Sequence, residues 1–195
     1  MKSKSLFKKG IKIEGLLLVQ PEIYSDERGF FFESWNQREF DSLIGDNIIF
    51  KQDNHSKSKK GVLRGLHYQL PPHDQGKLVR CSSGSIYDVA VDLRKNSPTF
   101  GEWTGIVLSD HNQTQFWIPS GFGHGFLTLS QEAEVQYKTT NYWNKDYEIS
   151  LNFSDKDLNI NLPLEEINPE IIQQSFKDIN SKNLKEITKN DKIFI

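Results

Sequence analysis

Residues 86–93 read Ile86-Tyr87-Asp88-Val89-Ala90-Val91-Asp92-Leu93, and their character alternates along the chain. In an extended strand, successive side chains point to opposite faces. One face of this stretch would carry the acids Asp88 and Asp92, and the other face is apolar throughout. The stretch therefore predicts a β-strand that separates a polar cavity from a hydrophobic layer.

Short apolar segments of this kind recur through the first two thirds of the chain. They are separated by Gly, Pro, Asn and Asp clusters at intervals of roughly 8–12 residues, which is typical of β-sandwiches and barrels. Further strands are expected at 105–109, 115–118, 125–129 and 134–139, and at the aromatic run 30–35. The pattern predicts an all-β fold: an antiparallel double sheet of the jelly-roll type, with a few short peripheral helices.

Two short helices are expected to interrupt the strands. Asn36 is a suitable N-cap for the first, which would end at Gly45. Pro169 is a suitable first residue for the second, whose apolar side would extend to Phe176. Because no repeat or linker is found, residues 1–195 are interpreted as a single domain with a short N-terminal arm. The polar tail after about residue 182 is expected to be loosely held.

The composition excludes several classes of protein. The chain has 195 residues, and 24 basic against 26 acidic side chains give a net charge of −2, unlike a nucleic-acid binder that relies on phosphate attraction. The apolar run Leu16–Val19 is far shorter than the ~20 residues that span a bilayer. No apolar stretch follows the basic segment 1–10, so no secretory signal is expected. Cys81 is the one cysteine, which favours the reducing cytoplasm.

The polar side chains between residues 52 and 80 point to a functional site. Arg64, His67, Lys77 and Arg80 fall within 17 residues, on strands that we expect to be neighbours. Gly65 interrupts the expected strand 62–69, and a glycine there commonly marks a bulge, without which Arg64 and His67 would lie on opposite faces. Each residue alone has an ordinary explanation, such as an edge arginine or a packed histidine, but their grouping indicates a site.

A metal site is the first alternative for this region. The cupins, which are metal-binding jelly rolls, place two histidines around one residue and a carboxylate a few positions later. Here Gln69 follows His67, and Pro71-Pro72 occupies the place of the carboxylate. His124 stays a candidate ligand, but one or two imidazoles are too few for a tight Zn²⁺ or Fe²⁺ centre. We therefore expect no catalytic metal.

Several long motifs, in order, resemble those of the dTDP-4-dehydrorhamnose 3,5-epimerases. They are residues 26–33 (Asp-Glu-Arg-Gly-Phe-Phe-Phe-Glu), 52–56 (Gln-Asp-Asn-His-Ser), 61–68, 75–80 (Gln-Gly-Lys-Leu-Val-Arg), 88–94, 117–126, 134–142 and 175–178 (Ser-Phe-Lys-Asp). The resemblance implies a cupin-type jelly roll, a homodimer, and neither a metal nor an organic cofactor. It also implies an isomerase of dTDP-L-rhamnose biosynthesis, which inverts C3 and C5 of a 4-keto-6-deoxyhexose carried on dTDP.

The resemblance further implies catalytic roles. A hydrogen beside a ketone is a weak carbon acid, and His67 matches the family's base, a role that suits histidine because its pKa lies near neutrality. Asp178 matches the carboxylate that fixes the imidazole tautomer, although by position alone it could be a solvated acid after a helix. Lys77 would stabilise the enolate oxygen. Tyr137 matches the phenol that returns a proton from the opposite face, although its alternation with Val135 also fits a packing residue.

Other matched positions would bind the nucleotide sugar: Gln52, Asn54, Arg64, His124, Trp143, Glu148 and Lys177. Trp143 stands where the family usually has a tyrosine that stacks on thymine, and indole can stack equally well. Arg28 and Glu33 match residues that reach the nucleotide from the partner subunit, on an exchanged N-terminal strand. Such an exchange would account for the apolar run 30–32, which could instead fill the chain's own core.

Three other functions stay open at this point. A related enzyme could epimerise C3 alone or act on a differently activated sugar, and Tyr137 would count against the C3-only version if the phenol completes the second inversion. A ketoisomerase could share the scaffold, although the pairing of His67 with Tyr137 makes it the weaker candidate. A non-catalytic sugar-nucleotide binding module would retain these residues without turnover.

Overall fold

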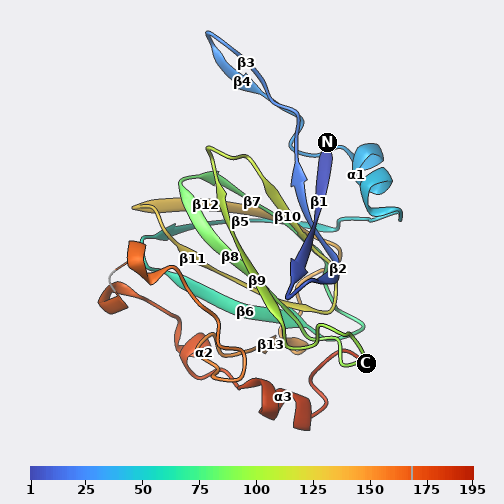
Figure 1. The fold of residues 1–195 in the computed structure, drawn as a ribbon, viewed down its shortest axis with the longest axis vertical. Coiled ribbons are helices and arrows are strands. Elements are labelled where there is room, and N and C mark those ends of the chain that lie inside the picture. The colour runs from blue at the N-terminus through green and yellow to red at the C-terminus, as the bar shows by residue number, and fades with distance from the viewer. Residues whose placement is uncertain (168) are drawn as a thin grey trace.

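Two antiparallel β-sheets pack face to face in the computed structural model, which describes residues 1–167 and 169–195 (Figure 1). One sheet has the strand order β1-β2-β10-β7-β12-β5, and the other has the order β13-β6-β11-β8-β9. The strands are β1 (Lys2–Lys8), β2 (Ile11–Gln20), β3 (Tyr24–Asp26), β4 (Gly29–Phe31), β5 (Gln52–Lys59), β6 (Leu63–Gln69), β7 (Lys77–Ser83), β8 (Ser85–Asp92), β9 (Trp103–Ser109), β10 (Gln115–Ile118), β11 (Phe122–Thr128), β12 (Glu132–Thr139) and β13 (Glu148–Ser150). The predicted all-β class with antiparallel sheets is confirmed.

Apolar side chains form layers on both sides of each sheet. Ala90 on β8 belongs to the cluster between the two sheets, whereas its neighbour Val89 belongs to a second cluster beneath the C-terminal segment. A third cluster lies under α1 (Gln37–Ile44), where the Phe40 ring meets the Trp117 ring edge-on at 5.3 Å between centroids. The alternation along β8 therefore separates two hydrophobic layers, because residues from the end of the chain cover the second face.

The two acids of β8 have different surroundings. Asp92, at the end of the strand, accepts hydrogen bonds from Arg94, Ser97 and Thr99 and so holds the turn that follows. Asp88 points between the sheets and contacts His124. The predicted polar cavity on this face of β8 is thus only partly right, since Asp88 reaches a functional region and Asp92 serves the turn.

The helices are short, and one expectation about them is wrong. The first runs from its N-cap Asn36, whose side chain accepts from the Glu39 amide, to Gly45, as the sequence predicts. The expected second helix does not continue to Phe176. Pro169–Ile171 forms a separate 3₁₀ turn, and α2 begins at Phe176, because Gln173 between them is extended and pairs with the start of β6, and Ser175 caps a new helix. The helical elements after residue 160 are η1 (Leu164–Glu166), η2 (Pro169–Ile171), α2 (Phe176–Ile179) and α3 (Leu184–Lys189).

The segment after residue 182 differs from the loosely held tail that we expected. Ile187 on α3 and Ile193 are buried in the cluster that covers the outer face of the five-stranded sheet. The Phe194 amide donates to the Leu93 carbonyl, and the Tyr68 hydroxyl donates to the Lys192 carbonyl. In Figure 1 this red segment lies beside β6 and β13. A few apolar side chains in a polar stretch are enough to dock it.

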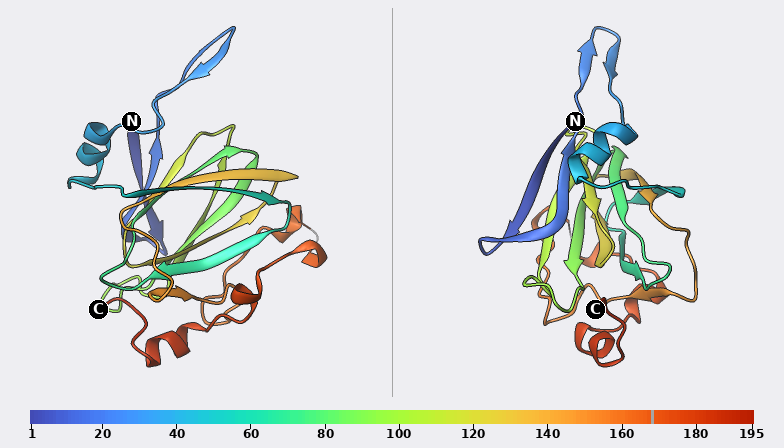
Figure 2. Two further views of the ribbon diagram at one scale, coloured as in Figure 1. Left: turned by 180° about the vertical axis from the view of Figure 1, so that it is seen from behind. Right: turned by 90° about the vertical axis from the view of Figure 1, so that its right-hand side faces the viewer.

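A hairpin formed by β3 and β4 projects from the body, which all three ribbon views show (Figures 1 and 2). The strand expected at 30–35 is shorter, ends at Phe31, and pairs with β3. Phe30 and Phe31 are 61% and 68% exposed, so the alternative that these rings fill the chain's own core is wrong for both. The hairpin therefore presents apolar rings to its surroundings.

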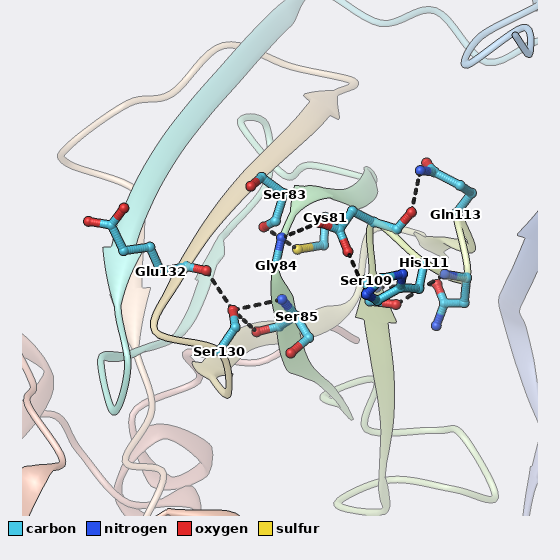
Figure 3. Close-up of polar contacts among 11 residues, drawn as sticks. Cys81, Ser83, Gly84, Ser85, Ser109, His111, Gln113, Ser130 and Glu132 are labelled. Carbon is cyan, nitrogen blue, oxygen red and sulfur yellow. Dashed lines mark hydrogen bonds and ion pairs between the residues drawn. The ribbon is translucent and has the colours of Figure 1, made fainter. Parts of the chain in front are cut away.

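A network of backbone and side-chain bonds fixes the turn between β7 and β8, at the end of β7 remote from Lys77 (Figure 3). The Ser130 hydroxyl accepts from the Ser85 amide and donates to the Glu132 carbonyl. Gly84 has φ +73°, and a Cβ there would lie 2.2 Å from that carbonyl oxygen. Glycine is therefore required for the tight turn that joins the two sheets.

Among the described residues, no helix is long and apolar enough to cross a membrane.

Candidate active site

A cavity of about 270 Å³ opens between the two sheets. Side chains from both sheets and from the segment before α2 line it: Gln52, Asn54, Ser56, Arg64, His67, Tyr68, Gln69, Gln75, Lys77, His124, Phe126, Tyr137, Trp143, Glu148, Ser175 and Asp178. Ten of the residues that the sequence suggested for the site are therefore brought together here. We call this cavity the central pocket.

A bulge in β6 brings Arg64 and His67 to the same side of the strand. Pairing with β11 shifts register between His124, opposite His67, and Phe126, opposite Arg64. Gly65 at the shift has φ +103°, and a Cβ on it would lie 2.6 Å from the His124 carbonyl oxygen. The bulge therefore depends on glycine, and the sequence signal of a glycine within this strand is confirmed.

His67 and Asp178 form an imidazole–carboxylate pair in the central pocket. The distance from His67 Nε2 to Asp178 Oδ1 is 2.6 Å, and the Ser175 hydroxyl donates to the other carboxylate oxygen. Burial acts to raise the pKa of Asp178, but its hydrogen bonds with His67, Ser175 and the Gly65 amide outweigh it, so the net pKa is lowered. An ionised carboxylate accepts only, so it fixes the proton on Nε2 and leaves Nδ1 as the basic atom.

Tyr137 enters the same pocket from the opposite sheet. Burial raises the pKa of its phenol; the positive charge of Arg64 opposes this rise, and Glu148 adds to it. Within the described part of the chain, its hydroxyl has no hydrogen-bond partner. The phenol is therefore protonated near neutral pH and is free to donate to a bound molecule.

Lys77 is buried at the start of β7 and lines the pocket. Burial lowers the pKa of its ammonium to about 8, while the charges of Glu148 and Asp88 act in the opposite direction. No carboxylate lies close enough to form an ion pair with it among the residues that the structure describes. This cation is consequently available to an oxygen that gains negative charge in the pocket.

A second histidine stands beside the first. His124 on β11 is the cross-strand neighbour of His67, and its Nε2 lies 3.0 Å from both carboxylate oxygens of Asp88. The candidate metal ligand of the sequence is thus engaged by a carboxylate. Among residues 1–167 and 169–195, no group of three or more His, Cys, Asp or Glu side chains is arranged to hold a metal ion.

Polar side chains surround the mouth of the pocket. The Gln52 amide donates to Asn54 Oδ1, and its carbonyl oxygen accepts from the backbone amide of Trp143. The Trp143 ring is largely exposed beside this pair. Glu148 lines the pocket and forms a 2.6 Å ion pair with Lys177, which tethers α2 to β13. Lys177 itself lies next to the pocket without lining it.

Arg28 and Glu33 lie outside the central pocket in this chain. Arg28 is on the projecting hairpin, where it forms an ion pair with Asp26. Glu33 follows the hairpin and accepts a hydrogen bond from the Asn36 side chain. Arg80, which the sequence grouped with the site, points to the outer face of its sheet and binds Gln136.

The sequence analysis did not assign several polar residues of this region to the site: Ser56, Tyr68, Gln69, Gln75 and Ser175, which line the pocket, and Asp88 beneath it. Asp88 supports His124 from beneath, and Ser175 both caps α2 and holds Asp178. The alternation of β8 did place Asp88 on an inward face, so a signal existed for that residue. Ser175 carried the ordinary sequence signature of a helix N-cap. The assembled pocket offers bases, a phenol and a buried cation, the groups needed to move protons at carbons beside a carbonyl.

Comparison with known proteins decides the family. The family model described as dTDP-4-dehydrorhamnose 3,5-epimerase matches residues 10–186. The chain belongs to this epimerase family. A curated relative from Shigella flexneri, a dTDP-4-dehydrorhamnose 3,5-epimerase, is 54% identical over 171 residues, which are 88% of this chain and 92% of the relative. The isomerase class and the family resemblance are confirmed.

Solved structures of similar proteins carry dTDP-sugars. The epimerase from Legionella pneumophila in complex with dTDP-4-keto-L-rhamnose has a TM-score of 0.89 and 44% identity, with 99% of this chain and 98% of that chain covered. ChmJ from Streptomyces bikiniensis, a 3′-monoepimerase in complex with dTDP-quinovose, has a TM-score of 0.85 and 33% identity, with 93% and 89% covered. The structures similar to this chain therefore include proteins described as a 3,5-epimerase and as a 3′-monoepimerase.

Proposed function

We propose that this chain is a dTDP-4-dehydrorhamnose 3,5-epimerase, which inverts C3 and C5 of dTDP-4-keto-6-deoxyglucose in dTDP-L-rhamnose biosynthesis. The observation that carries the proposal is the convergence of the His67–Asp178 pair and Tyr137 on one pocket, from opposite sheets. Inversion at a carbon needs a base on one face of the sugar ring and an acid on the other. Two sheets that flank one cavity provide these two sides.

His67 is the base in this proposal. Its Nδ1 takes the hydrogen beside the C4 ketone as a proton, the carbon–hydrogen electron pair forms a carbon–carbon double bond, and O4 becomes an enolate oxygen. Asp178 accepts a hydrogen bond from Nε2–H and, as an ionised carboxylate, stabilises the imidazolium that results. Lys77 is a preformed cation next to the oxygen that gains charge, which lowers the barrier to proton removal.

Tyr137 completes the inversion. Its hydroxyl gives a proton to the same carbon from the opposite face, and the enolate returns to a ketone. His67 then releases its proton to solvent and the Tyr137 phenolate takes one from solvent, so that no net proton is gained or lost. The same pair of groups acts at the second carbon, because C3 and C5 both adjoin C4.

The remaining pocket residues bind the nucleotide and the diphosphate. Arg64 donates to Ser58 and to a backbone carbonyl through part of its guanidinium, which leaves other N–H groups for phosphate oxygens. Trp143 offers an exposed indole at the mouth for stacking on the base. Gln52, Asn54, His124, Glu148 and Lys177 complete the substrate-binding set, and we assign no metal and no cofactor to the reaction.

A second copy of the chain supplies the rest of the site. The projecting hairpin carries Arg28 and exposes Phe30 and Phe31, and β5 stands at an edge of its sheet beside the central pocket. We infer a homodimer in which this N-terminal strand is exchanged, so that Arg28 and Glu33 reach the partner's nucleotide. Exposed aromatic rings on an isolated hairpin favour burial against a partner. We also assign this single-domain enzyme to the cytoplasm, because its one cysteine is a free, buried thiol, which suits a reducing compartment.

Deuterium exchange tests the proposed reaction. The protein is incubated in D₂O with dTDP-4-keto-6-deoxyglucose, and label is located by NMR or mass spectrometry. Label at both C3 and C5 with formation of the L-rhamno epimer is expected. Deuterium label without formation of the epimer would contradict the role of Tyr137 as the acid. Binding of dTDP without any deuterium label would indicate a non-catalytic binding module.

Epimerisation at C3 alone is the second candidate function. It is favoured by the similarity to the 3′-monoepimerase ChmJ, which is 33% identical and shares the fold at a TM-score of 0.85. In the same exchange experiment this enzyme would place label at C3 and leave C5 unlabelled. The position of the label therefore separates the two functions.

A further inference from the structure

Asp88 is a buried carboxylate beneath the central pocket. It has no exposed surface and does not line the pocket, yet both of its oxygens lie 3.0 Å from His124 Nε2. Leaving a charged carboxylate buried is costly unless it is paired. The contacts of Asp88 with neighbouring side chains must therefore offset the cost of burying it.

Those partners are two cationic or potentially cationic side chains of the pocket. His124 is the cross-strand neighbour of His67, so it lies at the end of the pocket where the proposed base acts. Lys77 enters from the opposite sheet, and the negative charge of Asp88 acts on it as well. Asp88 can thus influence the reacting end without touching the substrate.

The contact fixes which imidazole nitrogen faces the pocket. An ionised Asp88 accepts hydrogen bonds only, so His124 Nε2 must carry a proton that points at it. The other ring nitrogen, Nδ1, is then the atom available to a bound molecule. When the ring is also protonated at Nδ1, it donates a charge-assisted hydrogen bond to an oxygen that becomes negative.

Burial and the neighbouring cations act on Asp88 in opposite directions. Burial raises the pKa of Asp88, while His124 and Lys77 act to keep it ionised. The titratable groups around it are His124 on β11, Lys77 and the Cys81 thiol on β7, and Glu148 on β13, which acts on Lys77. Of these four groups only His124 is in hydrogen-bond contact with Asp88.

We propose that Asp88 is a positioning residue for the epimerisation: it holds the His124 ring with Nε2–H toward itself and Nδ1 toward O4. Its negative charge also favours the protonated form of Lys77, the second cation near that oxygen. Lys77 stabilises the enolate charge, and His124 shares this role when its Nδ1 is also protonated. This inference rests on the proposed function for the identity of that oxygen. The orientation of the His124 ring does not depend on it.

The first test compares two buried acids of one strand. Asp92 lies four residues along β8, is equally buried and hydrogen-bonded, and holds a turn away from the pocket, so Asp92→Asn is the matched control. We expect Asp88→Asn to lower kcat by about 10²-fold with KM changed less than threefold, since two stabilising donors weaken together. Asp88→Glu should recover part of the loss, and Asp92→Asn should keep kcat.

The pH profile distinguishes positioning from general damage. Without the Asp88 charge, burial lowers the pKa of Lys77 further, so the fall in kcat on the alkaline side should begin at lower pH in Asp88→Asn. Asp92→Asn should leave that limb in place. Equal profiles for both variants, or an unchanged kcat in Asp88→Asn, would overturn the proposal.

The second test uses the wild-type protein, so it does not depend on whether a variant folds. Long-range ¹H–¹⁵N NMR of the wild-type protein is expected to show His124 protonated at Nε2. A neutral ring protonated at Nδ1 would contradict the proposal even if the enzyme is active. Conversely, absence of C3 and C5 exchange with Nε2 protonated would reject the proposed function and leave the His124–Asp88 arrangement standing.

Discussion

Two imidazole–carboxylate pairs lie side by side at the central pocket, and they are built differently. In the His67–Asp178 pair the histidine side chain is 32% exposed, and its acid comes from a one-turn helix 111 residues away along the chain. In the His124–Asp88 pair the two side chains are 8% and 0% exposed, and both lie on neighbouring strands of the same sheet. The His67–Asp178 pair faces the cavity and takes its acid from a peripheral helix, whereas the His124–Asp88 pair is buried within the sheet.

This difference matches two chemical tasks. A base that exchanges its proton with solvent at each turnover needs access, which His67 has. A hydrogen-bond donor to a developing charge performs best when it is rigid and dry, because a preorganised dipole has nothing to reorganise during the reaction. In the proposed mechanism the exposed pair therefore moves protons, whereas the buried pair stabilises the charge that develops on the sugar.

Replacing each histidine gives the largest expected effect. His67→Ala should lower exchange at both C3 and C5 by about 10⁴-fold or more, because the base is lost. His124→Ala should lower kcat by about 10²-fold and retain exchange at both carbons. Both rates are measured with the D₂O assay, and the affinity for dTDP, measured by calorimetry, checks that each variant is folded. Similar losses in the two variants would contradict the distinction between the two pairs.

Lys77 tests the charge-holding side. Lys77→Met should lower kcat by about 10²–10³-fold, the usual result of removing one stabilising donor. In the wild type, burial lowers the pKa of this ammonium to about 8, so kcat should decline as pH rises through about 8 and the cation is lost. The exposed residue Lys185 is a control position, and Lys185→Met should keep the wild-type profile. A rate that stays flat to pH 9.5 would exclude a catalytic role for the Lys77 charge.

The two acids should give opposite dependences of stability on pH. The net pKa of Asp178 is lowered, because its hydrogen bonds outweigh the effect of burial. Its ionised carboxylate therefore stabilises the fold above about pH 3.9, the pKa of an aspartate in the unfolded chain. That stability is lost as the pH falls through the folded pKa. Asp178→Asn should cost about 1–3 kcal/mol at pH 7, with a smaller deficit below about pH 4.

Burial raises the pKa of Asp88, so the sign reverses there. The folded state binds this proton more tightly than the unfolded state, and the wild type loses stability as pH rises from about 3.9 toward the folded pKa. The stability of Asp88→Asn relative to wild type should therefore improve over that range. Chemical unfolding at several pH values measures both acids, and parallel slopes for the two variants would contradict the assigned environments.

Local opening should show the smallest difference. The α2 helix has four residues, and its Phe176 and Ile179 side chains are exposed, whereas β8 and β11 are central strands with buried side chains. Amide hydrogen exchange of residues 176–179 should be at least about tenfold faster than that of 88–91. A bound dTDP-sugar should slow the first set and leave the second unchanged, and equal protection in the free protein would show that α2 is as rigid as the sheet.

Much of the barrel could be predicted because its signals are local. Alternation in 86–93 and turn residues between apolar segments predicted the strands, and Asn36 and Gly45 predicted the bounds of α1. The glycine within β6 predicted the bulge that aligns Arg64 with His67. In each case the residues that determine the geometry are close together in the sequence.

Contacts between distant segments could not be predicted in this way. By position alone Asp178 had the pattern of an exposed acid, and only the family resemblance associated it with His67. The docking of Ile187 and Ile193 depends on a sheet face made of residues far earlier in the chain. The partner of Asp88 was likewise hidden, since alternation gives the face of a side chain and says nothing of the neighbouring strand.

The central claim is that His67 and Tyr137 stand on opposite faces of one sugar ring. A crystal structure of the protein with dTDP and a 4-keto or reduced hexose analogue tests this most directly. We predict C3 or C5 at about 3–3.5 Å from His67 Nδ1, with the Tyr137 hydroxyl across the ring and O4 toward Lys77. A sugar with both side chains on the same face, or one bound outside the space between them, would contradict the account.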